Sequence, residues 1–456
     1  MQTDLTQGSI RRGLITFSLP LIAGNLLQQF YNVVDTWVVG RFLGNIALAA
    51  VGSAFSLMNL LTSLLLGLCM GSGVVFSQLY GEGSRERMKT ALFNAFVMIA
   101  LLALVLTGAS YALLPQLIAL LRVPPEAVGE ITEYLLVIFS GMGFVFLYNF
   151  FSAALRSVGN SLASLLFLLL ATVVNIALDL LFVLGFGWGV AGAAGATVIA
   201  QALSAAGIAG YGFLRHRELI PRREHMRMDR TLLRRIAGVS VLTSVQQSIM
   251  NFGILMVQSL VNSFGIATMA AFAAGVKIDA FAYSPAQDFA NGFSTFIAQN
   301  TGAGRADRVR RGIREAAVMS LSFCAVISLL VFLFARPLLM LFIDPGEGES
   351  LAIGVGYLRT EGVFYVGIGL LFLLYATYRG LERAGMSVIL TVISLGLRVI
   401  LAYAFAPLFG VTAIWLSIPI GWFIADAAGL LRLKKTLLSL WESREKQKRG
   451  SAQPSA

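Results

Sequence analysis

Long apolar runs, interrupted by short polar or glycine-containing connections, make up most of the chain. Runs such as 162–186 and 317–335 approach or exceed the ~20 residues that a helix needs to cross a hydrocarbon core of about 30 Å. Lipid offers no hydrogen-bonding partner to an open backbone, so each span is expected to be α-helical. The pattern predicts an all-α polytopic membrane protein with 12 transmembrane helices, near 13–41, 47–78, 90–121, 127–155, 161–185, 190–214, 233–263, 268–299, 312–343, 352–378, 386–409 and 411–433.

Composition agrees with a membrane protein. Of 456 residues, 57% are hydrophobic and 12% are charged, whereas soluble domains carry roughly 25% charged residues. Cys69 and Cys324 fall inside apolar runs, which argues against a structural disulfide or a metal site. His216 and His225 lie in a basic loop, so a histidine proton relay inside the membrane is not expected.

Basic residues concentrate in alternate connections and account for the net charge of +11. One side of the membrane receives the N-terminal segment, the central connection 215–235 and the tail beyond Arg432, whereas the other side offers only Arg41, Arg122 and Arg336. By the positive-inside rule, both termini and the central loop are cytoplasmic. The surplus charge therefore indicates topology and contact with anionic membrane lipids rather than binding of nucleic acid.

The second half of the chain repeats the first. At an offset of 221 residues, one set of positions recurs: Gly44, Gly71, Gln78, Gly81, Gly83 and Arg87 as Gly265, Gly292, Gln299, Gly302, Gly304 and Arg308. At an offset of 226, Gly141, Gly143 and Gly159 recur as Gly367, Gly369 and Gly385. We therefore expect two pseudo-symmetric six-helix lobes around a central cavity. The predicted units are 1–222 with the basic linker, 223–436, and a disordered cytoplasmic tail over 437–456.

Four polar residues of the first half align with apolar residues in the second: Asp35, Asn175, Asp179 and Thr197 with Met256, Leu401, Phe405 and Ile418. The shared fold does not require them, and an ionised aspartate near the bilayer centre costs roughly 2.5–3.5 kcal/mol on insertion scales. Residue counts place both aspartates about 9 Å, and Thr197 about 12 Å, below the outer ends of their helices. Three helices are thus expected to bring two carboxylates, an amide and a hydroxyl to one layer.

This set of oxygen atoms suits a hard cation such as Na⁺. It equally suits a proton, because two neighbouring carboxylates in a low dielectric resist double ionisation. The alternative is a buried hydrogen-bonded cluster that only joins helices.

At these residues the chain resembles the multidrug and toxic compound extrusion (MATE) family. The resemblance covers nearly the whole chain, including the basic central loop and the Gly-Xaa-Gly loops at 81–83 and 302–304. The motif positions that resemble the first and fifth helices of the family are Pro20, Asn25, Gln28, Gln29 and Asp35, and Asn175 and Asp179. The resemblance implies an ion-coupled exporter of organic solutes in the inner membrane of a bacterium.

The resemblance is closer to the prokaryotic DinF-type branch than to the NorM-type branch. The former implies a cation site at Asp35, Asn175, Asp179 and Thr197, and a helix-1 hinge at Pro20, where a proline permits a kink. The latter uses a carboxylate on helix 7, but this chain has no Asp or Glu between Arg230 and Lys277. This departure favours coupling through the N-terminal lobe.

A second group of charges belongs to the second half alone: Lys277, Asp279, Asp288, Glu361 and Arg398. All but Asp288 fall at comparable depth by residue count. They form either an ion-paired network that holds helices together, as intramembrane charges usually do, or a polar wall of the cavity that binds solute. Two cations there would favour a solute with an anionic group.

The sequence therefore predicts a secondary active antiporter that exports cationic or amphipathic organic solutes in exchange for Na⁺ or H⁺ by alternating access. We expect a monomer with no cofactor, and no metal other than Na⁺ at the coupling site. A flippase for a lipid-linked precursor or an exporter of a specific metabolite is the alternative. A membrane-embedded enzyme is not expected, because the chain has no DDxxD-like cluster and no intramembrane histidine.

Overall fold

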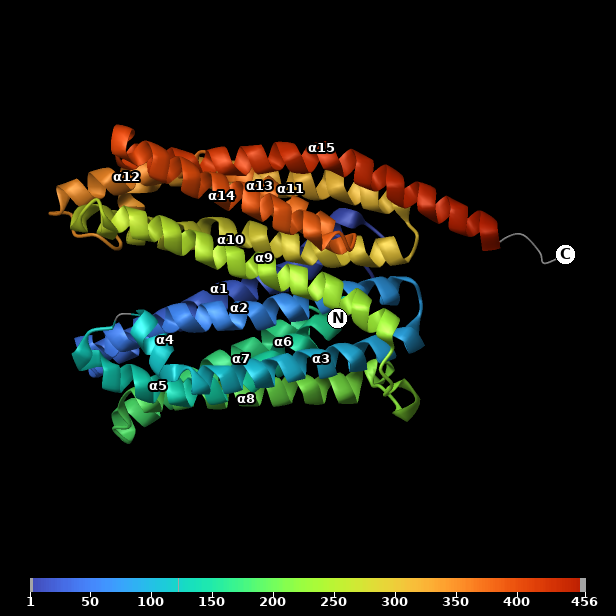
Figure 1. Ribbon diagram of the computed structural model, residues 1–456, viewed down its shortest axis with the longest axis horizontal. Helices are drawn as coiled ribbons and strands as arrows, with labels where there is room; N and C mark the ends of the chain where they lie inside the picture. Colours follow the sequence, from blue (N-terminus) through green and yellow to red (C-terminus); the bar gives the residue numbers. More distant parts are fainter. Residues whose placement is uncertain (1–2, 122, 452–456) are drawn as a thin grey trace. The chain divides into compact units, whose positions relative to one another are not determined.

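A computed structural model describes residues 3–121 and 123–451 of the chain, which form helices joined by short connections (Figure 1). The helices of the first half are α1 (Ile10–Phe42), α2 (Asn45–Gly81), α3 (Arg85–Ala112), α4 (Leu114–Leu121), α5 (Val128–Ser140), α6 (Met142–Ser157), α7 (Leu162–Asp179) and α8 (Gly189–Arg215). Those of the second half are α9 (Arg230–Asn262), α10 (Ile266–Gly302), α11 (Ala306–Leu339), α12 (Gly348–Gly362), α13 (Tyr365–Gly380), α14 (Ala384–Phe409) and α15 (Val411–Ser451). Short helical turns are η1 (Pro125–Ala127), η2 (Leu180–Gly185), η3 (Arg217–Leu219) and η4 (Arg223–His225).

These helices follow the predicted spans. By length and composition, 9 helices of the described residues are able to cross a membrane, or up to 11 if each of two bent pairs counts as one span. The 33-residue helix α1 is outside this set. We attribute this to Asn25, Gln28, Gln29, Asn32 and Asp35, which interrupt its apolar sequence.

Two predicted spans are bent rather than straight. The span 127–155 divides into α5 and α6, bent by 42°, and the span 352–378 divides into α12 and α13, bent by 50°. Each bend lies at or beside a glycine, Gly141 in the first half and Gly362 in the second, where the backbone is least restrained. The two bends fall at similar places in the two repeats, which hydropathy did not reveal.

The chain divides into two compact units, residues 1–4 with 16–248 and residues 5–15 with 249–456. The division differs from the boundary predicted at 222, because the first half of α9 packs within unit 1. Small residues allow this close packing: a Cβ on Gly67 would lie 2.3 Å from the Ser244 Cα, and the hydroxyls of Ser72 and Ser240 are 2.9 Å apart.

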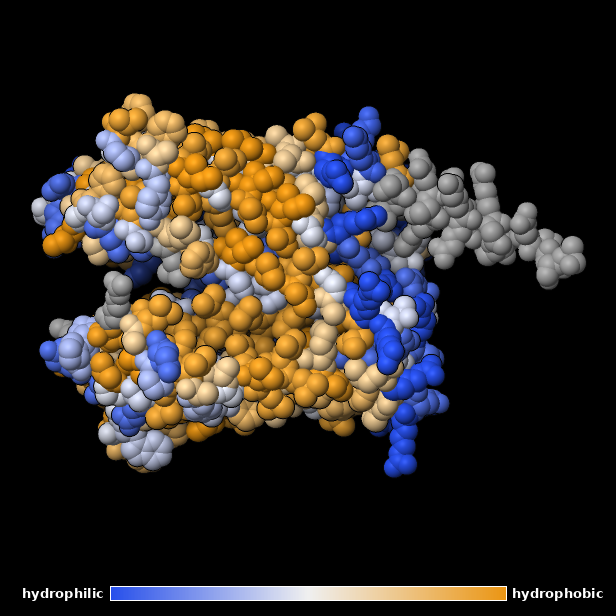
Figure 2. Space-filling view, in the orientation of Figure 1, coloured by the Kyte–Doolittle hydropathy of each residue, from blue (hydrophilic) through white to orange (hydrophobic). Residues whose placement is uncertain are grey.

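Within each unit, one long helix and one bent helix form the interior. In unit 1, α6 packs against α2, α3 and α8, and in unit 2, α13 packs against α10, α11 and α15. Both units present an apolar surface in Figure 2 and carry hydrophilic side chains at the end where their basic connections lie. This pattern is that of membrane-embedded helices with charged ends.

The tail differs from prediction. Residues 437–451 continue α15 as a helix rather than a disordered segment, while residues 452–456 lie outside the described part of the chain. The reason lies in local propensity, since Trp441-Glu-Ser-Arg-Glu-Lys-Gln-Lys-Arg449 has neither glycine nor proline and consists mostly of good helix formers.

Candidate cation site

The four predicted cation-site residues converge in unit 1. Asp35 lies half-buried on α1, Asn175 and Asp179 lie buried on α7, and Thr197 lies buried on α8. The Asn175 amide donates a hydrogen bond to the Thr197 hydroxyl at 3.3 Å. The carboxyl groups of Asp35 and Asp179 are close enough to interact electrostatically. Asp35 and Thr197 are far apart in the sequence, but each lies beside a polar residue of α7.

Two tyrosines join this cluster. The Tyr31 hydroxyl lies 3.0 Å from the Thr197 hydroxyl, and Tyr134 of α5 is buried beside both aspartates. Tyr31 precedes Asp35 by four residues and so shares its helix face, which was a signal available in the sequence. Tyr134 had no such signal, because only the folded unit brings α5 to α1.

The cluster holds more buried acceptors than donors. Among the described residues, Asp35 Oδ1, Asn175 Oδ1 and both carboxylate oxygens of Asp179 have no hydrogen-bond partner. A buried acceptor without a partner costs free energy. Such an arrangement is stabilised by a bound cation or by a proton shared between the carboxyl groups.

The backbone changes at the site. α7 ends at Asp179 and continues as the π-helical turn η2, in which Phe186 N–H donates to the Leu181 carbonyl at 3.0 Å. Single π-helical turns occur frequently at functional sites, because they reorient side chains relative to a regular helix. The sequence pattern predicted only an uninterrupted span here.

A polar cavity of about 130 Å³ adjoins the cluster. Its polar lining includes Gln28, Tyr31, Asn149, Asn175, Thr197 and Gln201. Asn149 and Gln201 were missed by reasoning from sequence. A signal was available for Gln201, which follows Thr197 by four residues and so shares its helix face. The amide and hydroxyl groups continue the polar environment of the cation site into the interior of unit 1.

In unit 2 the structure brings together three of the five predicted charges. Asp279 of α10 is buried and accepts hydrogen bonds from the hydroxyls of Tyr357 and Tyr365. Glu361 and Arg398 are buried close enough to Asp279 to interact electrostatically. Among the described residues, Glu361 Oε2 and Arg398 Nε have no hydrogen-bond partner.

Lys277 and Asp288 do not join this group. Lys277 is exposed, and its ammonium lies 5.7 Å from the centre of the Phe342 ring. Lys277 and Asp279 do not face the same way, because they are two residues apart on one helix; a role of these charges in a solute-binding cavity wall stays a prediction. Asp288 is buried nine residues further along α10, about 13.5 Å from Asp279.

A further buried acid, Asp426 of α15, was not predicted. It is 3% exposed, and neither carboxylate oxygen has a hydrogen-bond partner among the described residues. The available signal was its position as a lone acid in the span 411–433. Pro20 lies inside α1, which is continuous through it, and its role as a hinge stays a prediction.

Comparison with known proteins gives concordant results over nearly the whole chain. A family model described as MatE matches residues 20–181 and 242–404, so it matches once in each repeat. The chain is 29% identical to Probable multidrug resistance protein YpnP of Bacillus subtilis (strain 168), over 94% of this chain and 96% of that protein. It is 30% identical to Probable multidrug resistance protein YoeA of the same organism, over 81% of each chain.

The fold is also that of solved structures. A mutant of the MATE transporter VcmN from Vibrio cholerae superposes with a TM-score of 0.89 at 23% identity, covering 94% of this chain and 98% of that one. At this level of identity the likeness shows the fold alone.

Proposed function

Since the chain belongs to the MATE family, whose members are membrane transporters rather than enzymes, we propose that it is a secondary active antiporter. It exports organic solutes, cationic or amphipathic, in exchange for Na⁺ or H⁺. Its curated relatives bear names of multidrug resistance proteins, which supports export of several solutes. Both termini and the central linker lie in the cytoplasm, in accord with the positive-inside rule.

The observation that carries this proposal is the excess of buried acceptor oxygens around Asp179. Four of them, on Asp35, Asn175 and Asp179, have no donor among the described residues. A monovalent cation supplies the missing positive charge and is attracted by both carboxylates. Inward movement of one charge across 100 mV yields about 2.3 kcal/mol, so one ion per cycle suffices to drive a useful solute gradient.

Both candidate ions fit the chemistry of the cluster. The hydroxyl of Thr197 and the amide oxygen of Asn175 add neutral ligands to the carboxylates, as Na⁺ requires. The close approach of Asp35 and Asp179 equally favours one shared proton. Coupling through unit 1 also agrees with the DinF-type assignment, because no Asp or Glu lies between Arg230 and Lys277.

Transport in proteoliposomes tests the proposal. Vesicles are loaded with a fluorescent organic cation, and its movement is followed with an imposed Na⁺ gradient, with a pH gradient or with neither. We expect gradient-dependent movement in the native protein and none in Asp35→Asn, with Asp279→Asn as the matched control. Movement that ignores both gradients, or full activity of Asp35→Asn, refutes ion coupling at this site.

A second candidate function is export of a specific metabolite with an anionic group. The observation in its favour is the buried Arg398, whose Nε has no hydrogen-bond partner among the described residues. This candidate would be supported if anionic metabolites inhibit dye efflux by the native protein but do not inhibit it in Arg398→Gln. Competition that is the same in native protein and Arg398→Gln excludes it.

A further inference from the structure

The linker between the two repeats (residues 215–229) packs against the rest of unit 1. Its first residues bond the end of α6, where the Asn160 amide and His216 Nε2 are 3.1 Å apart. Its later residues bond α3: His225 contacts Glu86, and the Asn94 amide donates to the Arg227 carbonyl at 3.1 Å. The linker therefore has a defined course across the ends of α3, α6 and α8.

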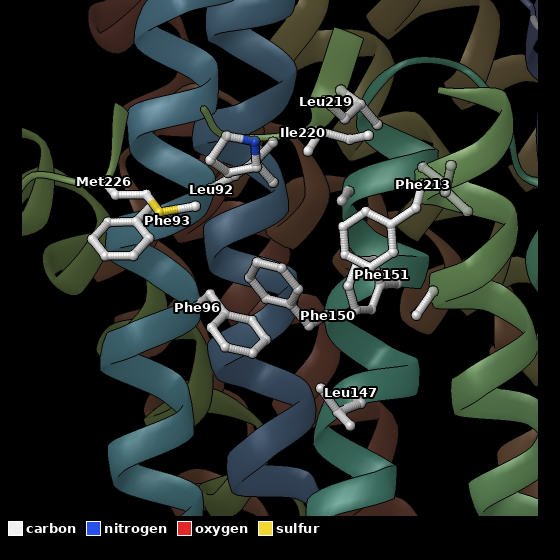
Figure 3. A pocket seen from close by; sticks show the side chains of 15 residues that line it. Leu92, Phe93, Phe96, Leu147, Phe150, Phe151, Phe213, Leu219, Ile220 and Met226 are labelled. Atoms are coloured by element: carbon white, nitrogen blue, oxygen red, sulfur yellow. The ribbon is translucent and has the colours of Figure 1, made fainter. Parts of the chain in front are cut away.

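Beneath the linker lies an apolar cavity of about 510 Å³ within unit 1. Each of its lining residues is apolar. Five of them are phenylalanines and four come from the linker: Phe93, Phe96, Phe150, Phe151 and Phe213, and Leu219, Ile220, Pro221 and Met226. Figure 3 shows these rings and the linker side chains around one space between α3, α6 and α8. The volume lies in the range of cavities that hold drug-sized ligands.

Aromatic contacts give the wall of this cavity a definite shape. The ring of Phe96 on α3 lies edge-on to Phe150 on α6 at 5.3 Å, and Phe151 lies edge-on to Phe213 on α8 at 5.5 Å. Phe213 is 47% exposed and Met226 is 52% exposed. Aromatic rings therefore line the cavity, and two of its lining residues, at opposite sides in Figure 3, are exposed to the surroundings.

Its depth corresponds to one leaflet of a bilayer. Phe96 is eleven residues from the start of α3, and Leu147 is ten residues from the end of α6. At 1.5 Å per residue, the cavity extends about 15 Å from the end of α6, which is half of a hydrocarbon core of ~30 Å. On α3 the linker reaches as far as Asn94, whose amide donates to the Arg227 carbonyl. A space of this depth and polarity matches an acyl chain that runs along the membrane normal.

Arginines outnumber acidic residues in the linker segment that lines the cavity, five to three over residues 215–229. Five exposed arginines lie within two residues of its lining positions: Arg215, Arg217, Arg222, Arg223 and Arg227. None of them forms an ion pair within 4.0 Å with a described residue. Arginine binds phosphate oxygens well, and basic segments beside a membrane attract anionic lipids.

We propose that this cavity, which we call the linker cavity, binds an anionic phospholipid from the leaflet on the linker side. One acyl chain fills the apolar space between α3, α6 and α8, and the linker arginines bind the headgroup phosphate. An apolar cavity of this size in contact with hydrocarbon is filled by it rather than by water, because its lining offers water no hydrogen-bonding partners. The bound lipid fastens the linker to unit 1.

The surplus of arginine in the linker argues against other occupants. A cationic solute, as expected for the export pathway, is repelled by five arginines. A water-filled cavity requires polar partners that the lining lacks. The linker cavity is thus independent of the cation site and of its proposed function.

Photo-crosslinking tests this inference on the full-length protein. The protein is reconstituted with phosphatidylglycerol that carries a diazirine in the middle of one acyl chain, or with phosphatidylcholine labelled in the same way. We expect labelled peptides from α3 and α6, and stronger labelling by phosphatidylglycerol. Ala209→Trp is expected to lower the labelling of these peptides at least about five-fold, because the indole occupies the space that the acyl chain needs.

Leu214→Trp is the control for Ala209→Trp, because Leu214 is 77% exposed on the same helix and does not line the cavity. Arg222→Gln with Arg223→Gln is expected to lower phosphatidylglycerol labelling about ten-fold, whereas Arg310→Gln with Arg311→Gln in unit 2 should not. If Ala209→Trp fails to fold, Met226→Trp is used instead. This substitution narrows the cavity from the linker and changes no residue of a transmembrane helix.

The outcomes are distinct. Labelling of α3 and α6 that Ala209→Trp and Met226→Trp leave unchanged refutes a lipid in the linker cavity. Equal labelling by the two lipids, or an equal loss in the unit 2 control, refutes recognition of the anionic headgroup. Displacement of the lipid probe by a fluorescent organic cation would show a solute site instead and also overturn the inference.

Discussion

Asp279 in unit 2 and Asp179 in unit 1 are both buried, but their surroundings differ. In unit 2, two tyrosine hydroxyls donate to Asp279, so its oxygens have permanent partners in the protein. In unit 1, both oxygens of Asp179 have no partner among the described residues. An acid with fixed donors stabilises a structure, whereas a pair of acids without donors is available to an exchangeable cation. Four predictions test whether Asp179 acts in ion coupling and Asp279 in stability.

The largest effect is expected from Asp179→Asn. The change preserves shape but removes the charge that attracts the cation, so coupled efflux should fall about 100-fold or more, a loss of roughly 2.7 kcal/mol. The measurement is gradient-driven dye efflux in proteoliposomes. Retained coupling, with a normal melting temperature, would mean that the cluster in unit 1 only joins helices.

Asp279→Ala is expected to act on stability instead. It leaves the buried hydroxyls of Tyr357 and Tyr365 without an acceptor, which should cost about 1–3 kcal/mol for each. Thermal unfolding in detergent should therefore begin at lower temperature, while the folded fraction still responds to an ion gradient. Loss of the ion response at unchanged stability would assign coupling to unit 2.

Thr197→Val should weaken ion binding more moderately. It replaces a neutral oxygen near the carboxylates by a methyl group of similar size, and it also removes the partner of Tyr31. We expect about a ten-fold loss of apparent ion affinity, or ~1.4 kcal/mol. Isothermal titration with Na⁺, and proton release measured in parallel, gives the value; an unchanged affinity for both ions excludes Thr197 as a ligand.

The smallest effects should come from charges outside both clusters. Lys277→Gln changes an exposed residue and should alter stability by less than about 0.5 kcal/mol. Asp426→Asn keeps the shape of a buried acid that has no partner among the described residues, and should leave ion coupling intact. A loss of coupling in either variant would contradict the proposal that Asp35 and Asp179 carry the coupling.

The sequence is sufficient to predict the class of protein, the course of its spans and the four residues of the candidate cation site. Hydropathy is sufficient for the spans, because the bilayer requires long apolar helices. Comparison of the repeats isolated Asp35, Asn175, Asp179 and Thr197, because charges that a shared fold does not need stand out against apolar counterparts.

Which polar side chains lie close together depends on the tertiary structure and could not be read from the sequence. Depth along a helix is readable from residue counts, but the direction of a side chain around the helix depends on how that helix packs. Residue counts therefore placed Lys277 at the depth of Asp279. In the structure Asp279 accepts hydrogen bonds from Tyr357 and Tyr365, and Lys277 lies over the ring of Phe342. The π-helical turn after Asp179, the bends beside Gly141 and Gly362, and the linker cavity also arise from packing between helices, which the pattern along one helix does not specify.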